Sequence, residues 1–70
     1  GMEKSRNYSV PFRVRVSIPD LNIRKGPGTD CTLTGKRTGI GVFTIIEEQN
    51  GWGRLKSGVG WICLSYAEKL

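Results

Sequence analysis

The sequence contains no histidine, only two cysteines and no long hydrophobic run. The absence of histidine excludes Ser-His and Cys-His catalytic arrangements and removes the most common transition-metal ligand. Two cysteines without histidine do not make a metal site. A membrane-spanning helix needs about 18 or more consecutive apolar residues, which no segment provides. We therefore expect no catalytic residues, no metal, no cofactor and no transmembrane segment.

The acidic residues also give no catalytic pair. Glu47 and Glu48 are neighbours in a segment that favours a strand, where adjacent side chains point to opposite faces. Two carboxylates in that arrangement cannot flank one glycosidic bond. Enzymatic activity of this chain is therefore the least favoured class of function.

The length of 70 residues predicts one small domain, which can bury only about 60% of the surface of its unfolded chain. Gly1 directly before Met2 is typical of tag removal, and the segment 1–10 is polar without periodicity. We interpret residues 1–10 as an N-terminal arm or linker with a tag remnant, and residues 11–70 as the domain. Met2 is either a natural start or a boundary inside a longer protein.

Basic residues outnumber acidic ones by 11 to 6, which gives a net charge of +5. This charge suits an anionic partner such as nucleic acid, a phosphate-rich polymer or an acidic membrane surface. It also lies within the range of about 2 to 8 that keeps a small domain soluble. Charge alone therefore does not identify a partner.

Alternating apolar and polar residues predict short strands. The period is two in PFRVRVSIP and resumes in LNIR, and VFTII continues the pattern. Asn50-Gly51 and Ser57-Gly58 are hairpin signals, and the end SYAEKL is expected to be a single turn or a frayed tail. The residues expected to face inward are Phe12, Val14, Val16, Ile18, Leu21, Ile23, Phe43 and Ile45, with Leu33 and Ile40 as further core candidates between residues 32 and 41.

These elements predict an all-β fold. Ten glycines favour tight turns, and no apolar stripe of helical period reaches ten residues. Short antiparallel strands in a chain too small for two full sheets close most readily into a small barrel that hides its sheet edges.

The segment LNIRKGPGTD, residues 21–30, resembles the L-N-x-R-x-G-P-G-[ST] signature of bacterial SH3 (SH3b) domains. Later features follow in the order of that family: EEQNGW at 47–52, GWI at 60–62, and SY at 65–66. The resemblance covers about residues 13–67. The end of the chain is also similar to the C-terminal repeats of clostridial and phage cell-wall amidases, as found in endolysins and autolysins.

The resemblance implies an SH3-like barrel of five to seven short antiparallel strands. It implies a non-catalytic module that binds peptidoglycan or an associated anionic wall polymer and holds a hydrolase, such as an N-acetylmuramoyl-L-alanine amidase, close to its substrate. The expected location is extracellular or at the cell wall, or cytosolic before release if the protein is a phage lysin.

Two positions depart from the pattern of this family. Cys31 stands where an aromatic residue is frequent, and Arg37 stands where an apolar residue commonly packs. Cys63 is predicted to point away from Ile62, so we expect Cys31 and Cys63 to be free thiols.

Candidate ligand-binding residues lie around the Gly26-Pro27-Gly28 turn, where Gly28 is suited to a positive φ. Amide, guanidinium, hydroxyl and carboxylate groups there can bind peptide groups, or they can bond locally, with Arg24 pairing with Glu47 or Glu48. Trp52 is expected to be exposed or half-exposed, and Trp61 is expected to be exposed if Ile62 is inward, but one of the two tryptophans must serve the core. Tyr66 either closes the groove or packs in the core. The resulting candidate set is Asn22, Arg24, Thr29, Asp30, Trp52 and Tyr66.

Two alternatives belong to other classes of function. Arg13 and Arg15 share one strand face, and with the net charge they are compatible with a basic small barrel that binds nucleic acid. A structural or protein-interaction domain that packs on its host protein is the third possibility. Of these partners, the resemblance to SH3b domains favours a wall component, and nucleic acid is not expected. The sequence leaves the oligomeric state open.

Overall fold

The computed structural model describes residues 10–70, which form one antiparallel sheet of seven strands. The predicted N-terminal arm lies, except for Val10, outside the described residues. The strands are β1 (Phe12–Val16), β2 (Leu21–Arg24), β3 (Leu33–Thr38), β4 (Gly41–Gln49), β5 (Trp52–Leu55), β6 (Trp61–Cys63) and β7 (Ala67–Lys69), and the 3-10 helix η1 (Leu64–Tyr66) precedes β7.

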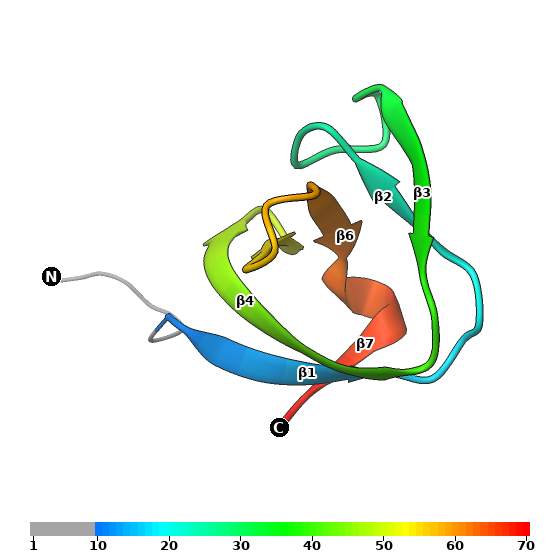
Figure 1. The fold of residues 1–70 in the computed structure, drawn as a ribbon. Coiled ribbons are helices and arrows are strands. Elements are labelled where there is room, and N and C mark those ends of the chain that lie inside the picture. Colours follow the sequence, from blue (N-terminus) through cyan, green and yellow to red (C-terminus); the bar gives the residue numbers. More distant parts are fainter. Residues whose placement is uncertain (1–9) are drawn as a thin grey trace, which may run out of the picture.

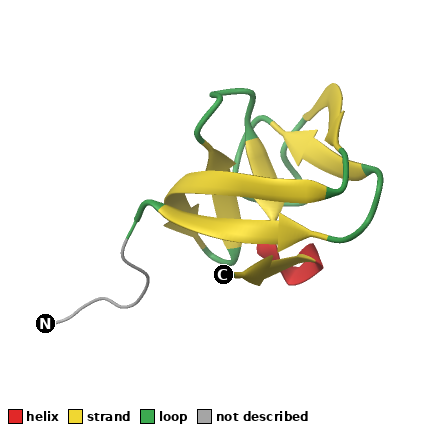
Figure 2. Ribbon diagram, turned by 60° about the horizontal axis from the view of Figure 1, so that its bottom comes forward, coloured by secondary structure: helices red, strands yellow, loops and turns green. Residues whose placement is uncertain are grey.

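The sheet curls into a small, open SH3-like barrel, as Figures 1 and 2 show. The strand order is β3-β2-β6-β5-β4-β1-β7, and every pairing is antiparallel. The all-β prediction is therefore confirmed. The expected closure of the barrel is wrong, because β3 and β7 remain the two edges of the sheet.

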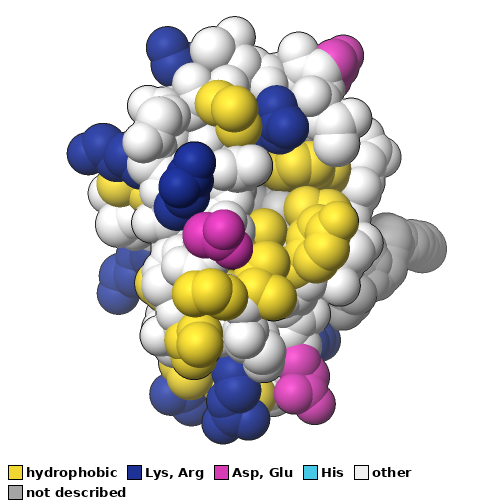
Figure 3. All heavy atoms as spheres, turned by 90° about the vertical axis from the view of Figure 1, so that its right-hand side faces the viewer, with side chains coloured by type: hydrophobic (Ala, Val, Ile, Leu, Met, Phe, Trp, Pro, Cys, Tyr) yellow, Lys and Arg dark blue, Asp and Glu magenta, His cyan; other side chains and the backbone are white. Residues whose placement is uncertain are grey.

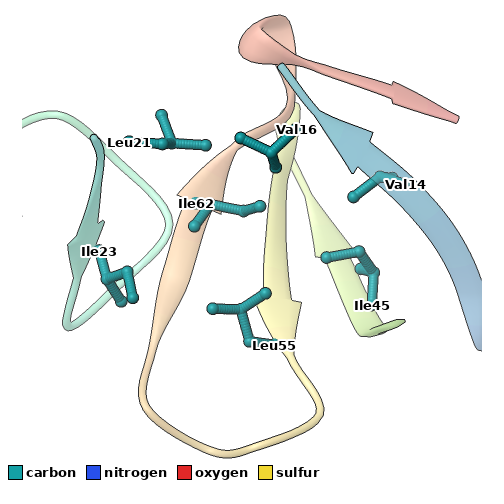
Figure 4. Packing of buried hydrophobic residues seen from close by; sticks show 7 residues of the cluster. All are labelled: Val14, Val16, Leu21, Ile23, Ile45, Leu55 and Ile62. Carbon is teal, nitrogen blue, oxygen red and sulfur yellow. The ribbon is translucent and has the colours of Figure 1, made fainter. Parts of the chain in front are cut away.

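The core lies inside the curl of the sheet, and all of its buried side chains except Leu55 and Ile62 stand at predicted inward positions. Seven buried aliphatic side chains converge there from five strands (Figure 4). Burial of such a side chain contributes about 1.5–3 kcal/mol, so these strands hold the domain together. The cluster consists of Val14, Val16, Leu21, Ile23, Ile45, Leu55 and Ile62, with Phe12, Ile18 and Phe43 packed against it.

The two core candidates between β2 and β4 are wrong. Leu33 is 48% exposed and Ile40 is 68% exposed. Leu33 begins an edge strand with a neighbour on one side only, and Ile40 lies in the short β3–β4 connection, so neither side chain is covered. The inner position of β3 is taken by Thr38, which pairs with Leu21 and is buried.

The C-terminal segment is more ordered than the sequence predicted. η1 supplies the expected single turn, but β7 then pairs with β1 through Val16–Ala67, Arg15–Glu68 and Val14–Lys69. The amide of Leu70 also donates to the carbonyl of Arg13, at 2.8 Å. A frayed tail is therefore wrong for residues 67–69.

Candidate functional site

A groove of about 300 Å³ opens where the starts of β2 and β5 meet η1 and the loop 25–32, which we call the first loop. Figure 3 shows the face of the molecule on the side of β3 and η1, where apolar side chains gather between basic and acidic ones. Five of the six candidate residues line the groove: Asn22, Arg24, Thr29, Trp52 and Tyr66.

Strand register explains why these residues meet. Arg24 lies opposite Trp61, and Trp52 lies opposite Cys63, so β2, β6 and β5 present one continuous outer face. Side chains alternate along a strand, so Ile62, which lies between Trp61 and Cys63 on β6, points inward and belongs to the core. The sheet therefore fixes the spacing of the groove floor.

The first loop is held in place by hydrogen bonds. Lys25 donates its amide to the carbonyl of Thr32 at 2.8 Å, and the Nη1 atom of Arg24 donates to the carbonyl of Cys31 at 2.9 Å. Within the loop, the amide of Cys31 donates to the carbonyl of Gly28 at 3.1 Å. These bonds fix the loop that carries Thr29, and they leave other donors of the Arg24 guanidinium for a ligand.

Gly28 does not adopt the positive φ that the turn prediction gave it. Gly28 instead allows the side chain of Asp30 to lie close to the backbone, because a Cβ atom at Gly28 would lie 2.7 Å from Oδ1 of Asp30. In the same way, a Cβ atom at Gly26 would lie 2.7 Å from Sγ of Cys31. The two glycines therefore allow the loop to fold tightly on itself.

The alternative in which Arg24 pairs with Glu47 or Glu48 is not the one that the structure shows. Nη1 of Arg54 lies 3.5 Å from Oε1 of Glu47, and Oε2 of Glu48 accepts a hydrogen bond from the amide of Gly51 at 3.0 Å. Both acids are engaged near the β4–β5 turn. Arg24 is therefore not neutralised by either carboxylate.

Asn22 has one local contact. Its Oδ1 atom accepts a hydrogen bond from Nε of Arg37 on β3, at 3.3 Å. This contact fixes the orientation of the side-chain amide and leaves the NH₂ group as a donor. Arg37, which stands at a position predicted to be apolar in the SH3b pattern, is exposed and acts here as a support for Asn22.

The predicted exposure of the two tryptophans is wrong. Trp52 is 9% exposed and Trp61 is 8% exposed. β5 and β6 lie in the middle of the sheet, so each indole has neighbours on both sides. Trp61 lies between Arg24 and Arg54 in the register, where long side chains can cover an aromatic ring. Trp52 still contributes to the groove lining, whereas Trp61 does not.

Tyr66 is 58% exposed on η1 and is the most accessible aromatic ring of the groove. Asp30 is the candidate that does not join the groove, because its side chain turns back over the first loop. Its Oδ1 atom lies 3.9 Å from Sγ of Cys31.

Four further residues line the groove and were not among the predicted site residues: Ile18, Asp20, Leu21 and Cys63. Cys63 could have been found, because strand alternation places it on the outer face and the hairpin register places it opposite Trp52. For Asp20, the sequence shows only that Pro19 and Asp20 form a turn, which does not indicate a place in the groove. Both thiols, Cys31 and Cys63, are free in the structure.

The groove combines opposite charges with neutral polar groups. Arg24 supplies a cation, Asp20 supplies a carboxylate, and Asn22, Thr29 and Tyr66 supply amide and hydroxyl groups. Such a set can recognise a peptide that carries both carboxylate and amino groups. Across residues 10–70, no three His, Cys, Asp or Glu side chains gather as metal ligands.

Comparison with known proteins finds a relative that matches part of the chain. The chain is 34% identical over 50 residues to the protein named "Putative N-acetylmuramoyl-L-alanine amidase YrvJ" of Bacillus subtilis (strain 168). The match covers 69% of this chain but only 10% of that protein. It associates the chain with a small part of a cell-wall amidase.

No family model matches the sequence, and no solved structure matches it. Between residues 10 and 70, no helix has the length and apolar character needed to cross a membrane.

Proposed function

We propose that this chain is a non-catalytic bacterial SH3 (SH3b) module that binds the peptide part of peptidoglycan. In this proposal it is attached to, or derived from, a peptidoglycan hydrolase such as an N-acetylmuramoyl-L-alanine amidase, and it acts outside the cell or at the wall. The observation that carries the proposal is the groove in which Asn22, Arg24, Thr29, Trp52 and Tyr66 meet. The similarity to part of an amidase supports the same reading.

Each groove residue has a chemical role in this proposal. The guanidinium of Arg24 binds a peptide carboxylate, and the NH₂ group of Asn22 donates to a peptide carbonyl. Asp20 attracts an amino group of the peptide. Tyr66 supplies an exposed ring and a hydroxyl, and the buried Trp52 gives a rigid apolar floor.

Binding of this kind raises the effective concentration of an attached enzyme at its substrate. A tethered hydrolase then meets its next bond without a new diffusive encounter, and the gain depends on the linker. The chain itself needs no reactive side chain for this function, which agrees with the absence of histidine.

The test is retention on purified peptidoglycan from which wall polymers have been removed. We expect the chain to bind, and a control protein of equal net charge not to bind. Tyr66→Ala is expected to weaken binding by roughly tenfold, because exposed aromatic anchors carry much of such binding energy.

Ile40→Ala is the matched control, since Ile40 is an exposed apolar residue that does not line the groove. Wild-type retention no greater than that of the charge control would overturn the proposal. Equal losses for Tyr66→Ala and Ile40→Ala would show that the groove is not the binding site.

A further inference from the structure

The outer side of β1 carries cations that the groove does not use. Arg13 and Arg15 are exposed and alternate with the buried Val14 and Val16. Because successive residues of a strand advance by 3.2–3.4 Å, the two arginines project from the same face about 7 Å apart.

Neighbouring strands extend this surface. Arg13 lies opposite Thr44 and Arg15 lies opposite Val42 on β4, and the amide of Lys56 donates to the carbonyl of Thr44 at 3.0 Å. A shallow hollow of about 430 Å³ lies along β4 and is lined by Val42, Thr44 and Lys56 among others. We call this surface the basic face: Arg13, Arg15, Val42, Thr44 and Lys56.

The cations of the basic face are not neutralised. Within residues 10–70, the side chains of Arg13, Arg15 and Lys56 have no ion pair or hydrogen bond, unlike Arg24 and Arg54. Glu68 on β7 lies opposite Arg15 in the register and is the nearest acid by strand position. Three cations against one carboxylate leave the surface positive.

We propose that the basic face binds a phosphodiester-linked anionic polymer of the cell wall, at a site separate from the groove. This inference rests on the proposed function. Arginine presents a planar fork that matches a phosphate group, and two arginines at a fixed spacing match a polymer with repeated charges. Thr44 adds a hydroxyl donor between Arg13 and Lys56.

A polymer without bases fits this face better than nucleic acid does. Single-stranded nucleic acid binding uses exposed aromatic rings on which bases stack. The aromatic residue at the hollow, Phe43, packs against the core, and the exposed apolar member of the face is the aliphatic Val42. Both tryptophans lie on the β5–β6 part of the sheet.

The experiment compares binding to Bacillus subtilis cell walls before and after hydrofluoric acid removes their phosphodiester-linked polymers. The wild-type chain is expected to bind untreated walls roughly tenfold more tightly, because each basic side chain near an anionic surface adds to affinity. We call this tighter binding to untreated walls the polymer increment. The double variant Arg13→Gln/Arg15→Gln is expected to lose the polymer increment and to retain binding to treated walls.

The double variant Lys25→Gln/Lys36→Gln is the matched control, because it removes the same charge from exposed positions outside the basic face. This control variant should keep the polymer increment. Glu68→Gln should enlarge the polymer increment, because the change removes the acid opposite Arg15. Thermal unfolding of each variant checks that the fold is intact.

The proposal is overturned if Arg13→Gln/Arg15→Gln keeps the polymer increment. It is also overturned if both double variants lose the polymer increment equally. A third arm uses a single-stranded oligonucleotide: tighter binding to it than to untreated walls, dependent on Arg13 and Arg15, also overturns it in favour of nucleic acid. Failure of the proposed function is a different result, namely no binding to treated walls by the wild-type chain.

Discussion

The groove and the basic face use polar side chains in opposite ways. In the groove, Arg24 is bonded to the first loop and Asn22 is bonded to Arg37, so their orientations are fixed before a ligand arrives. On the basic face, Arg13 and Arg15 have no such contacts among the described residues. Fixed groups favour recognition of one ligand shape, whereas free cations attract any regular polyanion over a longer range.

This difference shows how a domain of 70 residues can present two kinds of polar surface. The groove needs loop, strand and helix together, because its residues come from the β1–β2 connection, β2, the first loop, β5, β6 and η1. The basic face needs only the alternation of β1 and its neighbours. A change in the backbone between β2 and β6 should therefore damage the groove far more than the basic face.

The largest expected effect comes from Gly60→Ala. A Cβ atom there would lie 2.5 Å from the carbonyl oxygen of Arg24, and the φ of Gly60 is +146°. Since neither the β2 backbone nor the strained dihedral can adjust freely, we expect a loss of about 2–4 kcal/mol in the free energy of unfolding. Urea denaturation measures this loss.

Gly35→Ala is the control for Gly60→Ala. Gly35 also has a positive φ, but nothing lies within 4 Å of its Cβ position. We expect Gly35→Ala to lower the free energy of unfolding by only about 1 kcal/mol. Equal losses at the two positions would show that the close approach of Gly60 to the backbone of β2 does not matter for stability.

The next largest effect is expected for Arg24→Ala. The change removes the hydrogen bond to Cys31 and the cation of the groove, so the first loop loses an anchor and the proposed peptide ligand loses a partner. We expect about 1 kcal/mol less stability and roughly tenfold weaker binding to polymer-free peptidoglycan. Retention assays and urea denaturation measure the two effects.

Arg13→Ala removes the same type of side chain from the basic face and should leave both quantities nearly unchanged. Arg24→Lys keeps the charge but not the fork, and we expect it to recover only part of the binding. Full recovery by lysine would show that charge alone, rather than the guanidinium geometry, is what the groove uses.

Much of the fold could be predicted because its signals are local. The alternation in β1 and β2 and the Asn50-Gly51 turn, where φ is 54° and 80°, need only neighbouring residues. The positions of Leu33 and Ile40 could not be predicted, since their exposure depends on which strand becomes the sheet edge. β7 was missed for the same reason, because its partner β1 is distant in the sequence.

The groove could be predicted in part. The alternation of β2 displays Asn22 and Arg24, and the resemblance to SH3b domains adds Thr29, Trp52 and Tyr66. Asp30 does not line the groove, and the sequence could not show this because the direction of a loop side chain depends on how the loop folds over Gly28. The burial of Trp52 and Trp61 depends on both flanking strands, which no single segment reveals.

The smallest expected effect compares one acid from each region. Glu47 forms an ion pair with Arg54, and both side chains are about half exposed, at 50% and 48%. Glu68 lies opposite Arg15 without an ion pair. Glu47→Gln should therefore lower the free energy of unfolding by about 0.3 kcal/mol, and Glu68→Gln should change it less.

Salt separates this electrostatic effect from a change in packing. At about 1 M salt the screening length falls to roughly 3 Å, so the difference between Glu47→Gln and Glu68→Gln should disappear. Thermal unfolding at low and high salt measures the difference in stability between the two variants. A difference that persists at high salt would mean that Glu47 stabilises the β4–β5 hairpin through its contacts with the strand rather than through its charge.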